Sequence, residues 1–312
     1  MKQFTSVNDV PNPKQLVESA LALKRSPAGS LKGIGANKTI VMLFFNPSLR
    51  TRLSTEKAAL TLGMSVIEYN AGQGWQLEFE EGVVMNGEKA EHIKEAAAVI
   101  SQYADIIGIR TFPSLVDRER DYADFVLQQF MQHATVPIIS LESAIRHPLQ
   151  SLADWVTLEE HRPVHRPKVV LSWAPHPRAL PQAVANSFVE WMKLADVDLV
   201  VTHPEGYELA DTFGQDVNVE YDQHKALAGA DFVYAKNWSS YRDYGKILNQ
   251  DLAWMISPQK MALTNNGKFM HCLPVRRNVV VADGVLDSPA SLVIEQANNR
   301  TYAAMAVLKA IL

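Results

Sequence analysis

The sequence predicts an α/β protein with two doubly wound parallel-sheet domains. Short hydrophobic runs alternate along the chain with segments whose apolar residues recur at helical spacing. This alternation is typical of parallel sheets joined by right-handed crossovers. The chain has 312 residues, which is enough for two domains of ordinary size that each bury a core.

Composition and charge exclude several classes of protein. Hydrophobic residues make up 47% of the chain and charged residues 21%, as is typical of a globular protein. The net charge of −4 gives no footprint for nucleic acid or an anionic membrane, and we expect neither partner. The apolar runs are too short to span a bilayer, and the first 15 residues show no leader pattern. With a single cysteine, which excludes an internal disulfide, we expect a cytoplasmic protein.

The first half begins with a helix and a buried strand. Pro13–Lys24 has helical periodicity, and Thr39–Phe45 is a near-continuous hydrophobic run typical of a buried parallel strand. Asn46-Pro47-Ser48 interrupts this run. A second helix follows, in which Ala58 and Ala59 would allow close packing. Its apolar residues at helical spacing are Leu49, Leu53, Leu60 and Met64.

The opening turn of this second helix is a candidate phosphate site. Backbone N–H groups and the positive end of the helix dipole favour anions there. Two guanidinium groups and two hydroxyls add to them, from Ser48, Arg50, Thr51 and Arg52. Such a set suits a dianion, most plausibly phosphate. The alternative is a capped helix with solvated arginines, because helix starts favour Ser and Thr.

The rest of the first half continues the alternation. We expect a strand at Ser65–Tyr69, a long loop at Asn70–Gly87, a helix at Glu88–Tyr103, a strand at Asp105–Ile109 ending on Arg110, a helix at Asp117–Gln132 and a strand at Val136–Ser140 ending near Glu142. Ligands of parallel sheets bind beyond the carboxyl ends of the strands. The residues expected at that edge are Arg52, Arg110, Glu142 and His147.

The second half repeats the pattern. We expect helices at Pro148–Glu160, Gln182–Leu194, Tyr221–Leu227 and Ser291–Leu312, and strands at Lys168–Ser172, Val197–Thr202, Asn218–Glu220, Asp231–Ala235 ending on Lys236, and Lys268–His271. A proline-rich turn, Trp173–Pro181, follows the first of these strands.

Two further motifs complete a known pattern, His147-Pro148-Leu149-Gln150 and His271-Cys272-Leu273-Pro274. With the Ser-x-Arg-Thr-Arg stretch at 48–52, they resemble the carbamoyl-phosphate transferases, the family of aspartate and ornithine transcarbamylases. The resemblance covers nearly the whole chain. It implies the transcarbamylase fold, a homotrimer with shared active sites, and a carbamoyl-phosphate domain at 1–147 joined by the closing helix at 291–312. The acylornithine-binding domain would then be 148–290.

The resemblance implies a role for each motif. Carbamoyl phosphate would be held by the helix start and Arg110, His147 would donate a hydrogen bond to its carbonyl oxygen, and Gln150 would bind its NH2 group. The catalytic residues would be Thr51, Arg110, His147 and Cys272. The full carbamoyl-phosphate site would be Ser48, Leu49, Arg50, Thr51, Arg52, Trp75, Arg110, His147, Gln150, Cys272, Leu273 and Arg300. A neighbouring subunit would supply Trp75, and we expect neither a cofactor nor a metal ion.

These residues also have ordinary structural interpretations. His147 alone would be a helix-start histidine, Trp75 a lid or packing residue, and Arg300 a solvated helix charge. Cys272 raises another alternative, a thiolate nucleophile. We favour contact through the backbone carbonyls of Cys272 and Leu273, because an amine can attack this anhydride directly without a covalent intermediate.

Departures from the better-known relatives indicate an acylated amine substrate. The chain lacks the Asp and the Ser-Met-Gly loop of ornithine transcarbamylases and the His-Pro-Leu-Pro of aspartate transcarbamylases. It is similar instead to the N-acylornithine branch, whose proline-rich turn accompanies a knotted second domain. There Lys236 and Arg276 would hold the α-carboxylate, and Glu142 would face the nitrogen groups. The acylornithine site would be Glu142, His176, Leu180, Lys236, Arg276 and Ala90, although Lys236 alone also fits a surface lysine.

The identity of the acyl group depends on one position of the sequence. The position that distinguishes acetyl enzymes, with Glu, from succinyl enzymes, with Pro, is Ala90, where the next helix would begin. Alanine removes a charge that would repel a succinyl carboxylate, and Arg277 offers a second guanidinium for that carboxylate. Glu91 weakens this interpretation, because a one-residue shift restores the acid.

We therefore predict a transferase that moves the carbamoyl group from carbamoyl phosphate to the δ-amine of N-succinyl-L-ornithine in arginine biosynthesis. N-acetyl-L-ornithine is the alternative substrate. A non-catalytic paralogue that binds phosphate compounds is the alternative from a different class, and it is disfavoured because each chemical role has an occupant.

Overall fold

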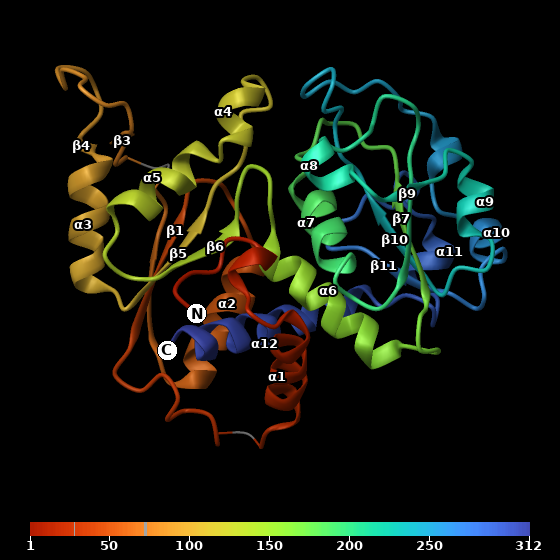
Figure 1. The fold of residues 1–312 in the computed structure, drawn as a ribbon, viewed down its shortest axis with the longest axis horizontal. Coiled ribbons are helices and arrows are strands. Elements are labelled where there is room, and N and C mark those ends of the chain that lie inside the picture. Colours follow the sequence, from red (N-terminus) through yellow and green to blue (C-terminus); the bar gives the residue numbers. More distant parts are fainter. Residues whose placement is uncertain (28, 72–73) are drawn as a thin grey trace. The chain divides into compact units, whose positions relative to one another are not determined.

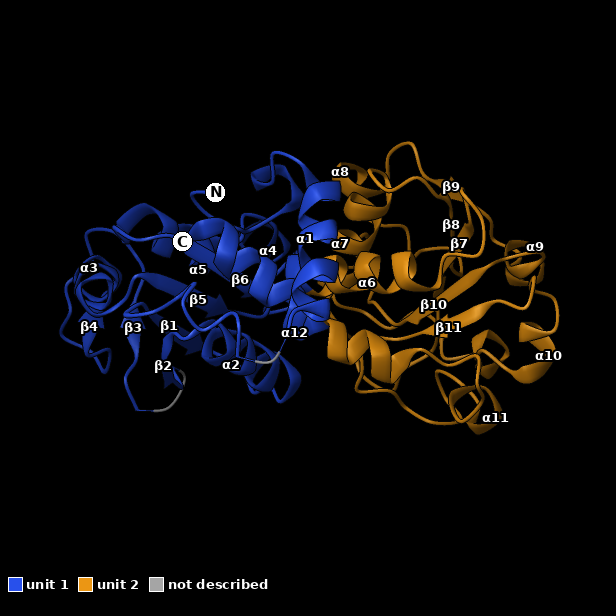
Figure 2. Cartoon of the chain, turned by 90° about the horizontal axis from the view of Figure 1, so that it is seen from below, with its two compact units in different colours: residues 1–149, 300–312 blue, residues 150–299 orange. Residues whose placement is uncertain are grey.

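Each of the two units into which the chain divides contains its own parallel sheet (Figures 1 and 2). The computed structural model describes residues 1–27, 29–71 and 74–312. Unit 1 comprises residues 1–149 and 300–312, and unit 2 comprises residues 150–299. The unit boundaries fall inside the helices α6 (Pro148–His161) and α12 (Val293–Ile311). The predicted α/β class with two parallel sheets is therefore confirmed.

The sheet of unit 1 has the order β2-β1-β5-β6, and all its pairs are parallel. Its strands are β1 (Thr39–Phe44), β2 (Ser65–Tyr69), β5 (Ile106–Arg110) and β6 (Ile138–Glu142). The strands β1, β5 and β6 are buried almost throughout, which explains their continuous hydrophobic runs. The helices are α1 (Pro13–Arg25), α2 (Arg50–Leu62), α3 (Ile93–Tyr103), α4 (Arg118–Tyr122) and α5 (Phe125–His133), after a 3-10 turn, η1 (Val7–Asp9).

Two predicted helices of unit 1 differ from the structure: the helix predicted at 88–103 begins later, and the helix predicted at 117–132 is interrupted. Residues 88–92 are not helical, because Glu91–His92 forms a strand, β4, that pairs with β3 (Leu77–Glu78) inside the expected loop at 70–87. Residues 72–73 of that loop lie outside the described residues. The expected helix at 117–132 is split into α4 and α5. The break falls at Asp124, whose φ is 53° and whose buried carboxylate accepts from the Ser143 hydroxyl at 2.6 Å.

Helix α2 packs through its small side chains. Its buried residues are Thr51, Thr55, Ala58, Ala59 and Leu62. The leucines that indicated the helix, Leu49, Leu53 and Leu60, remain more than half exposed. Alanine and threonine let the helix pack closely, and Leu62 is the one leucine of α2 on its buried face.

The sheet of unit 2 has the order β11-β10-β7-β8-β9. Its strands are β7 (Lys168–Trp173), β8 (Asp198–Thr202), β9 (Asn218–Val219), β10 (Phe232–Lys236) and β11 (Lys268–Met270). Its shorter helices are α7 (Ala183–Met192), α8 (Asp211–Gly214), α9 (Gln223–Leu227), α10 (Pro258–Met261) and α11 (Asp283–Leu286), with a 3-10 turn, η2 (Leu252–Trp254).

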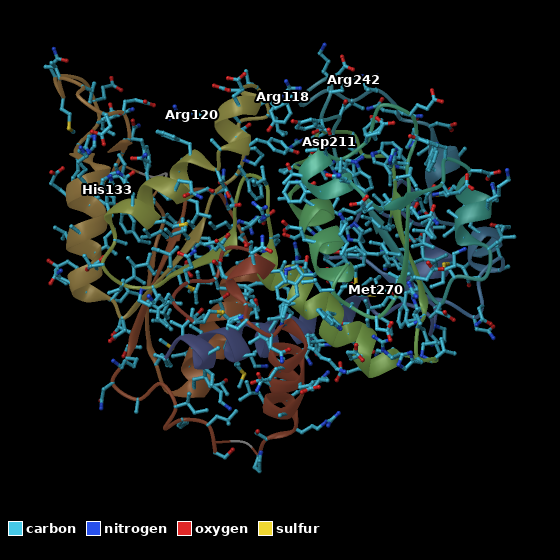
Figure 3. The ribbon with its side chains drawn as sticks, viewed as in Figure 1. Arg118, Arg120, His133, Asp211, Arg242 and Met270 are labelled. Carbon is cyan, nitrogen blue, oxygen red and sulfur yellow. The ribbon has the colours of Figure 1, made fainter. Side chains whose placement is uncertain are left out.

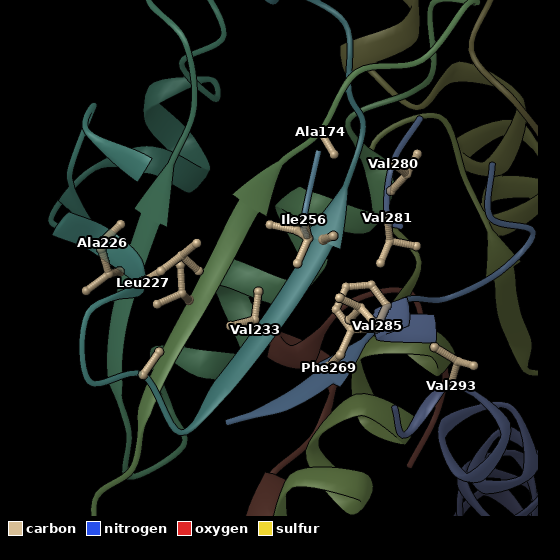
Figure 4. Close-up of a cluster of buried hydrophobic side chains, with 14 residues drawn as sticks. Ala174, Ala226, Leu227, Val233, Ile256, Phe269, Val280, Val281, Val285 and Val293 are labelled. Carbon is tan, nitrogen blue, oxygen red and sulfur yellow. The ribbon is translucent and has the colours of Figure 1, made fainter. Parts of the chain in front are cut away.

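A cluster of mainly aliphatic side chains forms the core on one part of this sheet (Figure 4). It includes Val170, Val233, Phe269 and Val281, all fully buried. Among the residues that the structure describes, no helix combines the length and apolar character needed to cross a membrane.

The end of α2 generates a test of the fold. Gly63 caps this helix with a φ of 89°, and a Cβ there would overlap the backbone carbonyl of Lys32. Gly63→Ala is therefore expected to lower the free energy of unfolding by more than about 2 kcal/mol, from steric overlap added to left-handed strain. Urea unfolding followed by tryptophan fluorescence measures the change.

Gly29→Ala is the matched control for the Gly63 variant. Its φ is 80°, but nothing lies within 4 Å of a Cβ built there, so only the strain applies. An effect at Gly63 no larger than at Gly29 would contradict the proposed overlap.

Candidate active site

The carboxyl edge of the unit 1 sheet positions most of the predicted phosphate site. Strand β1 ends at Phe44 and α2 begins at Arg50, so that Thr51 lies in the first helical turn with its side chain buried. Strand β5 ends on Arg110, opposite Glu142 at the end of β6. The register shifts between Ile109 and Arg110, and irregularities of this kind re-aim side chains at strand ends.

A buried hydrogen-bonded cluster centres on the Thr51 hydroxyl. The Oγ1 atom of Thr51 accepts from Nη1 of Arg110 at 2.9 Å and from Nη2 of Arg300 at 2.7 Å. Nη1 of Arg110 also pairs with Oε2 of Glu142 at 2.8 Å. His147 completes the cluster, with Nε2 3.5 Å from the same Glu142 oxygen and 3.4 Å from Nη1 of Arg300. All five side chains belong to unit 1 and are less than one-tenth exposed.

The cluster carries more positive than negative charge. Two guanidinium groups face one carboxylate, and Nε of Arg110 has no acceptor among the described residues. Burying unbalanced charge is costly, so the cluster favours an added anion with several acceptor oxygens. Burial lowers the pKa of Arg52, and the positive charge of the nearby Arg110 lowers this pKa further.

Arg52 itself is held at the end of β2. It forms an ion pair with Glu68 and a hydrogen bond with Asn70, and its guanidinium carbon lies 3.8 Å above the ring of Phe44. Trp75 is half-buried and packs edge to face on Tyr69, with ring centroids 5.7 Å apart. Ser48 and Arg50 are half-buried at the helix start, and Leu49 is exposed.

Unit 2 brings together a second group of predicted residues. His176 follows β7, Lys236 ends β10, and Arg276 follows the His271–Pro274 motif. Burial lowers the pKa of His176, and the positive charges of Lys236 and Arg276 lower it further. Lys236 and Arg276 therefore lie near enough to His176 for their charges to act on it. Leu180 is tied to the segment after β10, because its carbonyl accepts from the backbone N–H and the hydroxyl of Ser239, each at 2.9 Å.

Two residues that the sequence analysis missed hold the motifs of unit 2 in place. Oδ1 of Asp154 accepts from the side-chain amides of Gln150 and Gln296, each at 2.7 Å. Oε1 of Gln296 in turn accepts from the backbone N–H of His271 at 2.9 Å. The spacing of Gln150 and Asp154, four residues apart on α6, was a usable signal for the first of these bonds. The half-buried Cys272 follows His271.

The structure corrects the expectation for Arg277. Its guanidinium group donates to Asp283 at 2.8 Å and to Asp287 at 2.7 and 2.8 Å, and these bonds raise its pKa. Arg277 is therefore already paired with two carboxylates and is not the unpaired guanidinium that was expected to bind a succinyl carboxylate. Ala90 is exposed, donates its N–H to the Gln76 carbonyl at 3.0 Å, and lies three residues before α3 rather than at a helix start.

Two known domain families match most of the chain. Residues 2–160 match the carbamoyl-P binding domain of aspartate/ornithine carbamoyltransferases, and residues 181–311 match the Asp/Orn binding domain of the same enzymes. The chain belongs to the aspartate/ornithine carbamoyltransferase family. The predicted family is thus confirmed.

Individual relatives narrow the comparison to one branch. The chain is 54% identical to the N-succinylornithine carbamoyltransferase of Bacteroides thetaiotaomicron, over 99% of this chain and 98% of that protein. It is 38% identical to the N-acetylornithine carbamoyltransferase of Xanthomonas campestris pv. campestris, over 100% and 98%. The predicted N-acylornithine branch is supported by both.

Solved structures of the same branch superpose closely. A crystal structure of an N-acetyl-L-ornithine transcarbamylase matches with a TM-score of 0.93 and 37% identity over all of both chains. It is a variant with alanine in place of a glutamate, complexed with carbamyl phosphate and N-succinyl-L-norvaline.

The group in unit 2 generates a test of its electrostatics. Lys236→Met removes one of the positive charges that lower the pKa of His176, so this pKa is expected to rise in the variant. Titration of the histidine ring signals by NMR measures the change. Lys225→Met, which removes an exposed lysine from α9, serves as the control and is expected to leave the pKa unchanged. An unchanged His176 pKa in the Lys236 variant would contradict the proximity.

Proposed function

We propose that this protein transfers the carbamoyl group of carbamoyl phosphate to the δ-amine of N-succinyl-L-ornithine, giving N-succinyl-L-citrulline and phosphate in arginine biosynthesis. The observation that carries the choice of substrate is the identity of 54% to a succinylornithine enzyme against 38% to acetylornithine enzymes. N-acetyl-L-ornithine is the alternative substrate. The alternative from a different class of function, which we disfavour, is an inactive paralogue that binds phosphate compounds.

In this proposal the cluster around Thr51 binds the phosphate group. Arg110 and Arg300 donate to its oxygens, together with the start of α2 at Ser48, Leu49, Arg50 and Arg52. Glu142 occupies Arg110 in the structure, and an arriving dianion would compete with it for that guanidinium. Residues 1–147 with 291–312 would form the carbamoyl-phosphate domain, and residues 148–290 the acylornithine domain.

The carbamoyl group would be activated by polar contacts at its two ends. His147 donates to the carbonyl oxygen, on which negative charge grows as the amine attacks. Gln150 and the backbone carbonyls of Cys272 and Leu273 bind the NH2 group. The δ-nitrogen forms a bond to the carbonyl carbon, the bond from that carbon to the bridging oxygen breaks, and the departing phosphate takes the proton.

The amine substrate would bind through the second group. Lys236 and Arg276 hold the α-carboxylate, with His176 and Leu180 beside them, and Glu142 faces the nitrogen groups. Ala90 would face the acyl group. In this proposal Ala90 corresponds to the glutamate that is replaced by alanine in the solved variant complexed with N-succinyl-L-norvaline. A complex of that variant with a succinyl compound supports a succinyl substrate for this chain, in which the position is alanine.

The proposal includes the assembly and location of the protein. It would be a cytoplasmic homotrimer with a knotted acylornithine domain, in which Trp75 of a neighbouring subunit covers the phosphate. Neither nucleic acid nor a membrane would be a partner.

A citrulline-forming assay tests the function directly. With carbamoyl phosphate present, turnover is expected with N-succinylornithine, less with N-acetylornithine and none with free ornithine. Activity with ornithine alone would refute the branch, and activity with none of the three amines would favour the inactive paralogue.

Thr51→Val removes the acceptor shared by two guanidinium groups, and it is expected to lower turnover by about 10²-fold in the same assay.

The acyl preference is tested at a single position. Ala90→Glu places a carboxylate beside the succinyl group, so kcat/KM for N-succinylornithine is expected to fall roughly 10- to 100-fold, with a much smaller change for N-acetylornithine. Steady-state kinetics with both amines measures the ratio. Glu91→Ala is the comparison variant, and a larger change in preference there would show that the neighbouring position reads the acyl group.

A further inference from the structure

A hollow in unit 2 is lined by residues that the proposed reaction does not use. Its volume is about 450 Å³, within the range of small-ligand sites. It lies among α7, β8, α8 and β9, and none of its lining residues was predicted to bind either substrate. Its apolar wall includes Val189, Val201 and Leu209. Its polar groups that can carry charge are His203, Glu208 and Asp211.

His203 presents a fixed hydrogen-bond acceptor to this hollow. The residue is 1% exposed, and Nδ1 lies 2.9 Å from the carbonyl oxygen of Pro204, so Nδ1 carries the proton and donates it. Nε2 is then the acceptor, and it has no hydrogen-bond partner among the residues that the structure describes. Edge-to-face contacts with Tyr221 at 5.4 Å and Trp238 at 6.3 Å hold the ring in this orientation.

Two carboxylates add negative charge to the hollow. Glu208 accepts from the Tyr221 hydroxyl and the Gly206 backbone N–H, each at 3.3 Å, which orients its side chain. Asp211 is exposed at the first turn of α8 (Figure 3). The lining residues include no lysine or arginine. The hollow therefore offers hydrogen-bond acceptors and negative charge beside an apolar wall.

We propose that this hollow binds a small aliphatic amine, with one ammonium group between Glu208 and Asp211 and a second donor at Nε2 of His203. The hydrocarbon chain would lie against Val189, Val201 and Leu209. A diamine with about four carbons has both donors and an apolar middle that matches this order of groups. The site is separate from the proposed carbamoyl transfer, because binding requires neither carbamoyl phosphate nor turnover.

Calorimetric titration of the full-length protein with 1,4-diaminobutane, without carbamoyl phosphate, tests the proposal. Saturable binding of one molecule per chain is expected, and 1,4-butanediol, which has the same length without the charges, is expected not to bind. Absence of saturable heat with the diamine would overturn the site and indicate that water alone fills the hollow. The result is independent of which amine the enzyme carbamoylates.

Two variants locate the binding. Glu208→Gln and His203→Phe are each expected to weaken binding about tenfold, because each removes one acceptor of a charged donor. Glu205→Gln is the matched control, since this exposed acid lies three residues from Glu208 but does not line the hollow. The assignment would be refuted if the Glu205 variant lost as much affinity for the diamine as the site variants, or if neither site variant lost affinity. Thermal unfolding of each variant verifies that it is folded.

Discussion

The hydroxyl group of Thr51 accepts hydrogen bonds from two buried guanidinium groups, and the organisation of unit 1 depends on this sharing. Arg110 lies 59 residues from Thr51 and Arg300 lies 249 residues away, so one oxygen atom joins the start of α2 to β5 and to α12. Placing two like charges on one acceptor is costly in a buried site unless anions compensate it. Glu142 supplies compensation at Arg110, with Oε2 of the carboxylate 2.8 Å from Nη1.

The edge of the parallel sheet makes this arrangement possible. Strands β1, β5 and β6 end at the same side, so Arg110 and Glu142 come together without any need for sequence proximity. The start of α2 adds backbone donors there, and α12 returns Arg300 from the far end of the chain. Charge is thus concentrated where the proposed chemistry occurs, while the core below is packed from apolar side chains.

In unit 2, hydrogen bonds rather than a dense cluster of charges position the predicted binding residues. Asp154 and Gln296 link α6 and α12 to the His271 segment through neutral and ionic hydrogen bonds. Burial lowers the pKa of His176, and the positive charges of Lys236 and Arg276 around its imidazole lower that pKa further. A carboxylate is the natural complement of such a group, whereas the acidic hollow beside β8 complements a cation.

The sequence by itself determined the α/β class, nearly all the long elements and the family, because hydrophobic periodicity and short motifs are local properties of the chain. Only the tertiary structure decided which partners each charge finds. Arg277 pairs with Asp283 and Asp287, Arg52 turns to Glu68, and Asp124 breaks a helix by bonding Ser143. The exposed leucines of α2 have the same origin. Each outcome depends on contacts between residues apart in sequence, whose energies exceed the weak local preferences on which sequence patterns rely.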